Sequence, residues 1–161
     1  SCVAYDSAVN QEGIRHRSLK LAALQKTLKT PPLHGDDEGD LLVIGWGSTK
    51  GAIEEAVDRL RAKGHRVASL HLKFIQPMAS GIRESMARFR QVMTIENNWS
   101  DRLEDEIIDA DNRRYTELAT LLRARFLVDV DCWSEVKGIP LKPGTVERVV
   151  LDKLQSMEVA P

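Results

Sequence analysis

The run Leu41-Leu42-Val43-Ile44, followed at once by Gly45, constrains the fold of this chain more than any other feature. Consecutive apolar residues that end at a glycine are typical of a strand buried on both faces, the strand type of parallel sheets. The next segment carries apolar residues at the i, i+3, i+4 and i+7 positions of one helix face: Ile53, Ala56, Val57 and Leu60. Ser48 or Thr49 can cap the start of this helix and Gly64 can end it, so the pattern predicts a strand, a tight turn and a helix.

The rest of the chain repeats this alternation. We expect further strands at residues 67–72, 92–95 and 126–130, and helices that carry Ile82, Met86 and Phe89, that start at the capping pair Asp101 and Glu104, and that cover residues 146–154. Strands that alternate with helices at this spacing indicate an α/β fold. The expected architecture is a three-layer α/β/α, Rossmann-like domain with a mostly parallel sheet of four to five strands.

An N-terminal helical extension is predicted before the first strand. Residues 14–28 form a helical pattern whose apolar stripe is narrow, consisting of Leu21, Leu24 and Leu28. Pro31, Pro32 and the polar residues up to Asp40 indicate a connector that stops the helix. The stripe can pack on this domain or on a neighbouring domain or subunit. If it packs elsewhere, a chain of residues 36–161 should melt close to the full chain.

Two loops are the candidate functional site, because ligands of such sheets collect beyond the carboxyl ends of the strands. The first loop contains Gly47, Ser48, Thr49, Lys50 and Gly51. Its glycines allow backbone N–H groups to point at an anion above a helix start, although the spacing GxGxxxG is not the GxGxxG of dinucleotide folds. The alternative is a tight strand-to-helix turn, in which a β-branched side chain at residue 51 would clash with the sheet.

The second loop contains Glu96, Asn97 and Asn98. A carboxylate beside two amides can take part in acid–base chemistry, but a single carboxylate lacks the partner that such chemistry usually needs. The alternative is structural, with the asparagines capping turns and Glu96 bracing neighbouring backbone amides. The residues therefore predict a ligand or interface loop and no catalytic residue.

Composition excludes several classes of protein. Lys and Arg number 23 against 24 Asp and Glu, which removes the expectation of nucleic-acid binding. No apolar run approaches the roughly 20 residues of a membrane span, and we expect no membrane association and a cytoplasmic location. Cys2 and Cys132 form no CxxC pair, the four histidines are scattered, and the acids of 101–111 lack the spacing of a calcium loop, so no metal site is expected. The chain starts at Ser1 without a leader pattern, which suggests a piece of a longer polypeptide.

The motifs resemble one known family. Gly45-Trp46-Gly47-Ser48-Thr49-Lys50-Gly51 is similar to the GSTxG loop in the alpha subunit of 2-oxoacid:ferredoxin oxidoreductases, at the start of their domain II. Glu96-Asn97-Asn98 resembles the acidic-Asn loop of the family, and Gly138-Ile139-Pro140 resembles its segment before the last helix. The resemblance covers roughly residues 36–155 and looks most like the 2-oxoglutarate branch.

The resemblance implies a transketolase C-terminal-like domain at 36–161. Residues 1–35 would then be a helical linker from a preceding thiamine-binding domain. The whole enzyme would use thiamine diphosphate, Mg²⁺, coenzyme A and an iron–sulfur cluster to oxidise a 2-oxoacid, with a beta subunit and ferredoxin as partners. This chain has no Gly-Asp-Gly motif for magnesium and diphosphate, and it has two cysteines where a cluster needs about four.

The expected function is therefore a non-catalytic C-terminal domain of the alpha subunit, with no cofactor of its own. The alternatives are the C-terminal domain of another thiamine enzyme, such as transketolase or the E1 component of a 2-oxoacid dehydrogenase, or a stand-alone module that senses an anion or binds a protein.

Overall fold

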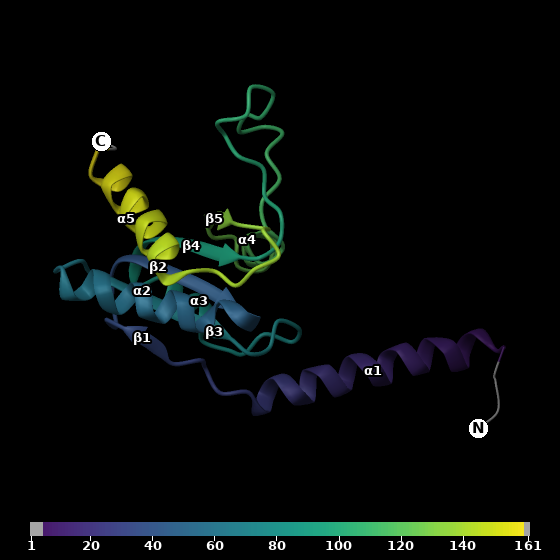
Figure 1. Ribbon diagram of the computed structural model, residues 1–161. Coiled ribbons are helices and arrows are strands. Elements are labelled where there is room, and N and C mark those ends of the chain that lie inside the picture. Colours follow the sequence, from purple (N-terminus) through teal and green to yellow (C-terminus); the bar gives the residue numbers. More distant parts are fainter. Residues whose placement is uncertain (1–4, 160–161) are drawn as a thin grey trace.

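The protein forms a single five-stranded sheet with helices on both faces and one long helix that extends away from it (Figure 1). The structure, a computed structural model, describes residues 5–159, so Cys2 lies outside the described residues. The elements in chain order are α1 (Ser7–Thr27), β1 (Leu33–Gly35), β2 (Gly39–Trp46), the 3-10 turn η1 (Gly47–Thr49), α2 (Lys50–Ala62), β3 (Val67–Leu72), α3 (Ile82–Met86), β4 (Phe89–Glu96), α4 (Glu117–Phe126), β5 (Asp131–Ser134) and α5 (Pro143–Val159).

The sheet has the strand order β1-β3-β2-β4-β5 and is parallel except for β1, which runs antiparallel to β3. The chain passes from β2 to β3 on one side and then crosses to β4 on the other side of β2. The carboxyl ends of β2 and β4 therefore flank the point at which the strand order reverses, where such sheets form crevices. Trp46 lies opposite Leu72 at the end of β2.

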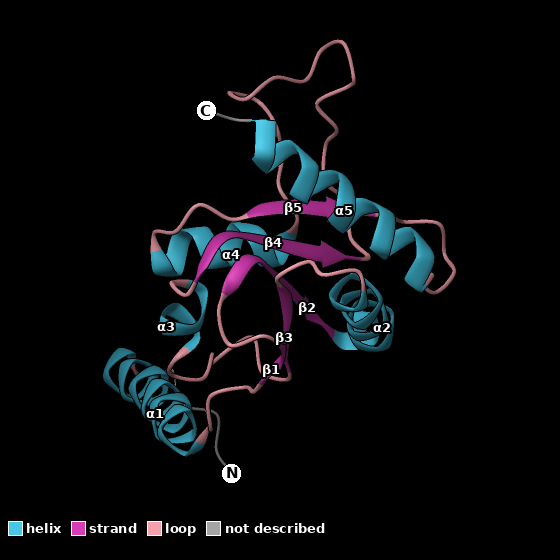
Figure 2. Cartoon of the chain, turned by 90° about the vertical axis from the view of Figure 1, so that its left-hand side faces the viewer, coloured by secondary structure: helices cyan, strands magenta, loops and turns pink. Residues whose placement is uncertain are grey.

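Alternation along β2 divides the core into two layers. Leu41 and Val43 pack against α2 and α5, and Leu42 and Ile44 pack against α3 and α4. All four side chains are fully buried, as expected of a central strand that is covered on both faces. Figure 2 shows α2 and α5 on one side of the sheet and α3 and α4 on the other. The predicted α/β/α architecture and the mostly parallel sheet are confirmed.

Helix α1 runs beyond the sheet and buries none of its residues. The exposed fractions of Leu21 and Leu24 are 43% and 38%, whereas Leu28, just after the helix, packs against the core. Gln25 also attaches the helix end to the domain, because its amide donates to the carbonyl of Met78 at 2.8 Å. The helix is longer than predicted and leaves most of its apolar surface free.

The predicted connector contains a strand that its polar residues did not indicate. Residues Leu33–Gly35 form β1, whose three positions lie opposite Leu70, Ser69 and Ala68 of β3. The sheet therefore begins before residue 36, and a chain that starts there would lack an edge strand as well as Leu28. The expectation that such a chain melts like the whole protein must be corrected.

Two expectations for the second half of the chain are wrong. Asp101 does not begin a helix: residues 101–115 form an irregular loop and α4 starts only at Glu117. Leu103 and Ile107 would share one face of such a helix, but both side chains are exposed, so no tertiary packing favours the helix. The fourth parallel strand is Asp131–Ser134 and not 126–130, because Phe126 ends α4 and Leu127 closes it in the left-handed region, at φ 54°.

Smaller differences concern three element ends. Phe89 begins β4 and does not belong to the preceding helix, although it joins the same core layer as Met86. Helix α5 starts at Pro143, earlier than the predicted 146, because proline fits the first position of a helix. Thr49 stands at the N-cap position of α2, but its hydroxyl donates to the carbonyl of Trp46 at 2.9 Å and makes no cap bond.

Candidate functional site

The two predicted loops meet at the reversal point of the sheet. The amide of Asn97 donates to the hydroxyl of Ser48 at 3.3 Å, which joins the loop after β4 to the turn after β2. Between them lies a hollow of about 280 Å³, lined by Trp46, Gly47, Ser48, Thr49, Asn97 and Asn98. Five of these six residues belong to the predicted site, and Trp46 is the addition.

Glu96 is the only carboxylate among the predicted site residues, and it is fully buried. Its Oε2 accepts hydrogen bonds from the indole of Trp46 at 3.2 Å and from the side-chain amide of Asn98 at 2.9 Å. The backbone N–H groups of Leu118 and Ala119 donate to Oε2 at 3.0 Å and to Oε1 at 3.3 Å. A carboxylate surrounded by four donors is occupied, so the structural interpretation of Glu96 is supported by its geometry.

These bonds cap α4 from another element. Helix α4 begins with free N–H groups, as every helix does, and Thr116 at its N-cap makes no side-chain cap bond. Asn98 completes the cap, because its Oδ1 accepts from the backbone N–H of Glu117 at 3.3 Å. The hydroxyl of Thr116 instead pairs with that of Thr94 at 3.0 Å inside the core. Strand β4 and its following loop therefore hold the first turn of α4 in place.

The two remaining predicted residues lie in the first turn of α2. The ammonium of Lys50 pairs with Glu54 at 2.6 Å and makes no bond to the second loop. Gly51 is exposed, and a Cβ built on it meets nothing within 4 Å, so the expected clash with the sheet is wrong. The tight position is Gly45, where an added Cβ would overlap Cδ1 of Ile53 and lie 2.6 Å from Oγ1 of Thr49. Close packing therefore requires a glycine at position 45, inside β2, and the turn itself places Gly47 in the left-handed region at φ 60°.

Partial burial lowers the pKa of His71 on the neighbouring strand β3, and the ammonium groups of Lys50 and Lys73 act in the same direction, while Glu54 opposes them. The imidazole therefore stays neutral at neutral pH.

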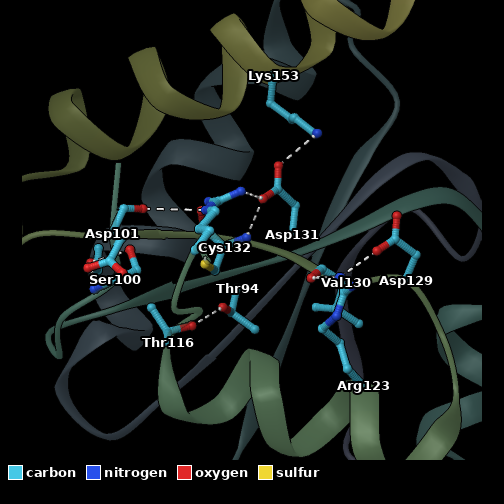
Figure 3. A network of polar contacts seen from close by, with 12 residues as sticks. Thr94, Ser100, Asp101, Thr116, Arg123, Asp129, Val130, Asp131, Cys132 and Lys153 are labelled. Carbon is cyan, nitrogen blue, oxygen red and sulfur yellow. Dashed lines mark hydrogen bonds and ion pairs between the residues drawn. The ribbon is translucent and has the colours of Figure 1, made fainter. Parts of the chain in front are cut away.

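A second, larger hollow of about 680 Å³ lies between the 101–105 segment, β5 and α5, which the sequence analysis did not single out. Asp131 lies in it and accepts from Arg113 at 3.3 Å and from Lys153 at 2.9 Å (Figure 3). Burial acts to raise the pKa of Asp131, but the bonds from Lys153 and the N–H of Cys132, with the charges of Lys153 and Arg113, outweigh it and lower the pKa. An acid at the start of a short strand was the only signal of this hollow in the sequence.

Asp101 closes the loop that borders this hollow. Arg114 binds its carboxylate in a bidentate manner, at 2.9 Å to each oxygen, and the indole of Trp99 donates at 2.9 Å. These bonds and the backbone N–H of Arg114 hold the pKa of Asp101 well below its usual range. The guanidinium of Arg113 also reaches the carbonyl of Cys132, so Asp101, Arg113 and Asp131 are already paired within the chain.

Two kinds of site find no support among residues 5–159. No three His, Cys, Asp or Glu side chains of this range gather in a way that could hold a metal ion. No helix of the range is long and apolar enough to cross a membrane.

Comparison with known proteins gives a consistent family. Residues 39–124, more than half of the chain, match the family described as pyruvate:ferredoxin oxidoreductase core domain II. The chain is 29% identical, over 92% of its length, to 2-oxoglutarate oxidoreductase subunit KorA of Mycobacterium tuberculosis, and it spans 20% of that protein. It is 36% identical over 41% of its length to 2-oxoacid:ferredoxin oxidoreductase 1 subunit alpha of Aeropyrum pernix, of which it covers 11%. The chain thus corresponds to a fraction of each of these relatives.

Solved structures show the same fold. A 2-oxoglutarate:ferredoxin oxidoreductase from Magnetococcus marinus, solved with 2-oxoglutarate, coenzyme A and succinyl-CoA bound, matches 94% of this chain and 24% of its own, with a TM-score of 0.76 and 24% identity. A split-gene transketolase, an inactive beta4 tetramer, matches 80% of this chain and 43% of its own, with a TM-score of 0.52 and 17% identity. The transketolase C-terminal-like fold that the motifs predicted agrees with both.

Proposed function

Because the chain belongs to the pyruvate:ferredoxin oxidoreductase core domain II family, we propose that it is a non-catalytic domain of the alpha subunit of a 2-oxoglutarate-type 2-oxoacid:ferredoxin oxidoreductase. The observation that carries the proposal is the burial and hydrogen bonding of Glu96. The carboxylate of the candidate site is buried and bonded to four donors, two of them backbone amides of α4. It is held where a cap is needed and has no access to a substrate.

The donor set of the chain does not fit the cofactors of the whole enzyme. Cys132 is the one cysteine of residues 5–159, and it is buried, whereas an iron–sulfur cluster needs about four thiolates. In the larger hollow, Asp101 is paired with Arg114, and Asp131 is paired with Arg113 and Lys153. No three His, Cys, Asp or Glu side chains of residues 5–159 gather there in a way that could hold Mg²⁺. We therefore infer that the cluster and Mg²⁺ are held by other parts of the enzyme.

The domain would serve assembly. Residues 1–35 would lead from a preceding thiamine-binding domain, and the remainder would support the alpha subunit and its contact with a beta subunit, in a cytoplasmic enzyme that passes electrons to ferredoxin. The exposed indole of Trp46, 39% accessible beside Ser48 and Asn97, supports a role of the small hollow as a contact surface. An exposed aromatic side chain at a shallow hollow is typical of protein contacts.

Calorimetry tests the proposal. We expect no heat of binding when thiamine diphosphate with Mg²⁺ is titrated into the 161-residue chain, and no turnover of 2-oxoglutarate with coenzyme A. Micromolar binding of thiamine diphosphate would contradict a non-catalytic domain.

A second titration separates an anion sensor from the assembly role. The probes are inorganic phosphate and coenzyme A, and the readout is the amide resonances of residues 45–51. We expect no saturable shifts, because the first turn of α2 presents a lysine already paired with Glu54. Saturable shifts confined to these residues would favour the sensing function.

A further inference from the structure

Two segments of opposite charge lie unpartnered on this chain. The first is the basic helix, residues 13–29, which contains five Lys or Arg and no acid. No residue of α1 is buried, and Ile14, Leu19 and Leu21 are 50%, 50% and 43% exposed. A helix of this length is marginal in water unless it packs against something. Four of its cations make no ion pair with any residue of 5–159: Arg17, Lys20, Lys26 and Lys29.

The second segment is the acidic loop, residues 101–112, which contains six acids and one arginine. Asp101 is taken by Arg114, but the other five acids have no ion-pair partner within the described part of the chain: Glu104, Asp105, Glu106, Asp109 and Asp111. Leu103 and Ile107 are 54% and 83% exposed between them. The loop thus combines unpaired charges with exposed apolar side chains, as the basic helix does, but its charges are negative.

The acidic loop has a defined conformation. Asp101 and Arg114 close its base through their side chains and through a backbone hydrogen bond of 2.9 Å from the N–H of Asp101 to the carbonyl of Arg114. At its far end, Asp109 accepts from the N–H groups of Asp111 and Asn112, and Asn112 donates to the carbonyl of Ile107 at 2.8 Å. A loop held at both ends loses little conformational entropy when it docks.

The two segments cannot meet within one molecule. The basic helix leaves the sheet at the β1 edge and the acidic loop projects beyond the β5 edge, on opposite sides of the five strands. Figures 1 and 2 show them apart in both views. Their complementary charges can therefore act only between molecules.

We propose that the basic helix of one copy of this chain docks on the acidic loop of a second copy. Opposite charges draw the segments together over a Debye length of about 10 Å at moderate salt. The exposed side chains of Ile14 and Leu21, which lie on one face of the helix, then cover those of Leu103 and Ile107. A twofold axis repeats the contact reciprocally and closes a dimer with two such contacts. The inference does not depend on the proposed function, although a subunit-assembly domain is where such a contact would serve.

Sedimentation velocity of the 161-residue chain tests the contact. In about 20 mM NaCl, we expect the chain to associate reversibly at protein concentrations of up to about 200 µM. In about 500 mM NaCl we expect it to be largely monomeric, because salt screens the charges. A loop variant, Glu104→Lys with Asp105→Lys and Glu106→Lys, should weaken self-association by about tenfold or more. A helix variant, Arg17→Glu with Lys20→Glu and Lys26→Glu, should do the same.

Mixing the two variants gives the decisive result. Each variant alone opposes like charges, but in the mixed pair both contacts unite opposite charges, so we expect the mixture to associate as the wild type does. The control variant, Arg66→Glu with Arg83→Glu and Lys142→Glu, lowers the net charge as much as the helix variant does. Its changes lie outside both segments, so it should associate as the wild type does. A wild-type chain that stays monomeric in low salt overturns the proposal. So does a mixture that stays monomeric while each variant keeps the circular dichroism spectrum of the wild type.

Discussion

Gly45 and Gly51 belong to the same loop motif, but Gly45 has close neighbours while Gly51 is surrounded by open space. We expect Gly45→Ala to destabilise the fold by about 1–3 kcal/mol, because the added methyl group overlaps Ile53 and approaches Thr49. Gly51→Ala should stabilise it by about 0.5–1 kcal/mol, since Gly51 lies in a helix with open space around it. Urea unfolding of both variants measures the difference. Equal effects at the two positions would contradict the packing described here.

A second residue, Asp101, makes the stability of the fold depend on pH. Arg114 and Trp99 lower its pKa in the folded chain, so its contribution is complete above the unfolded pKa of about 3.9 and is lost as pH falls through the lower, folded value. We expect Asp101→Asn to be less stable than the wild type at pH 7 and the difference to shrink below about pH 4. Urea unfolding across this range measures it. Asp105→Asn, in the same loop but without an ion pair, is the control and should show no such change.

Among the elements, α1 and β1 differ sharply in what they contribute to the domain. The side chains of residues 5–24 are exposed, and a chain that begins at residue 25 keeps Gln25 and Leu28 in contact with the domain. We therefore expect a chain of residues 25–161 to melt within a few degrees of the whole chain. A chain of residues 36–161 should melt clearly lower, because it lacks β1 and Leu28. Scanning calorimetry of the two truncated chains decides this. Indistinguishable melting curves would show that β1 adds nothing to the sheet.

The elements also show which parts of the fold a sequence can predict. Strand β2 was predicted from its continuous apolar run and helix α2 from its apolar periodicity, and a glycine marks the end of each pattern. Strand β5 was misplaced because Phe126–Val130 is more apolar than Asp131–Ser134, and only pairing with β4, in which Thr94 lies opposite Cys132, selects the second segment. Strand β1 was missed for the same reason, since its place depends on β3 and not on its own residues.

At the scale of the whole molecule, the two predicted loops do meet, but the hydrogen bonds around them could not be predicted. The strand order brings the ends of β2 and β4 together, and alternation along the chain was sufficient to predict which loops would meet. No local pattern indicated that the carboxylate of Glu96 would accept hydrogen bonds from backbone amides more than 20 positions later in the chain. Capping between distant elements is a property of the assembled fold, so a single sequence can suggest it only as an alternative.

The capping of α4 by β4 has a consequence for how the protein opens. The amides of Leu118 and Ala119 would exchange their hydrogens early if α4 frayed from its own first turn, as helix ends normally do. Here their acceptor is the buried carboxylate of Glu96 at the end of β4, so they are released only when the end of β4 separates from α4. We expect hydrogen exchange followed by NMR to give these two amides protection like that of β4, and Glu96→Ala to return them to the rate of a frayed helix end while Ile95 in the strand keeps its protection. Strand β4 and the first turn of α4 would then behave as one cooperative unit, in which both open together.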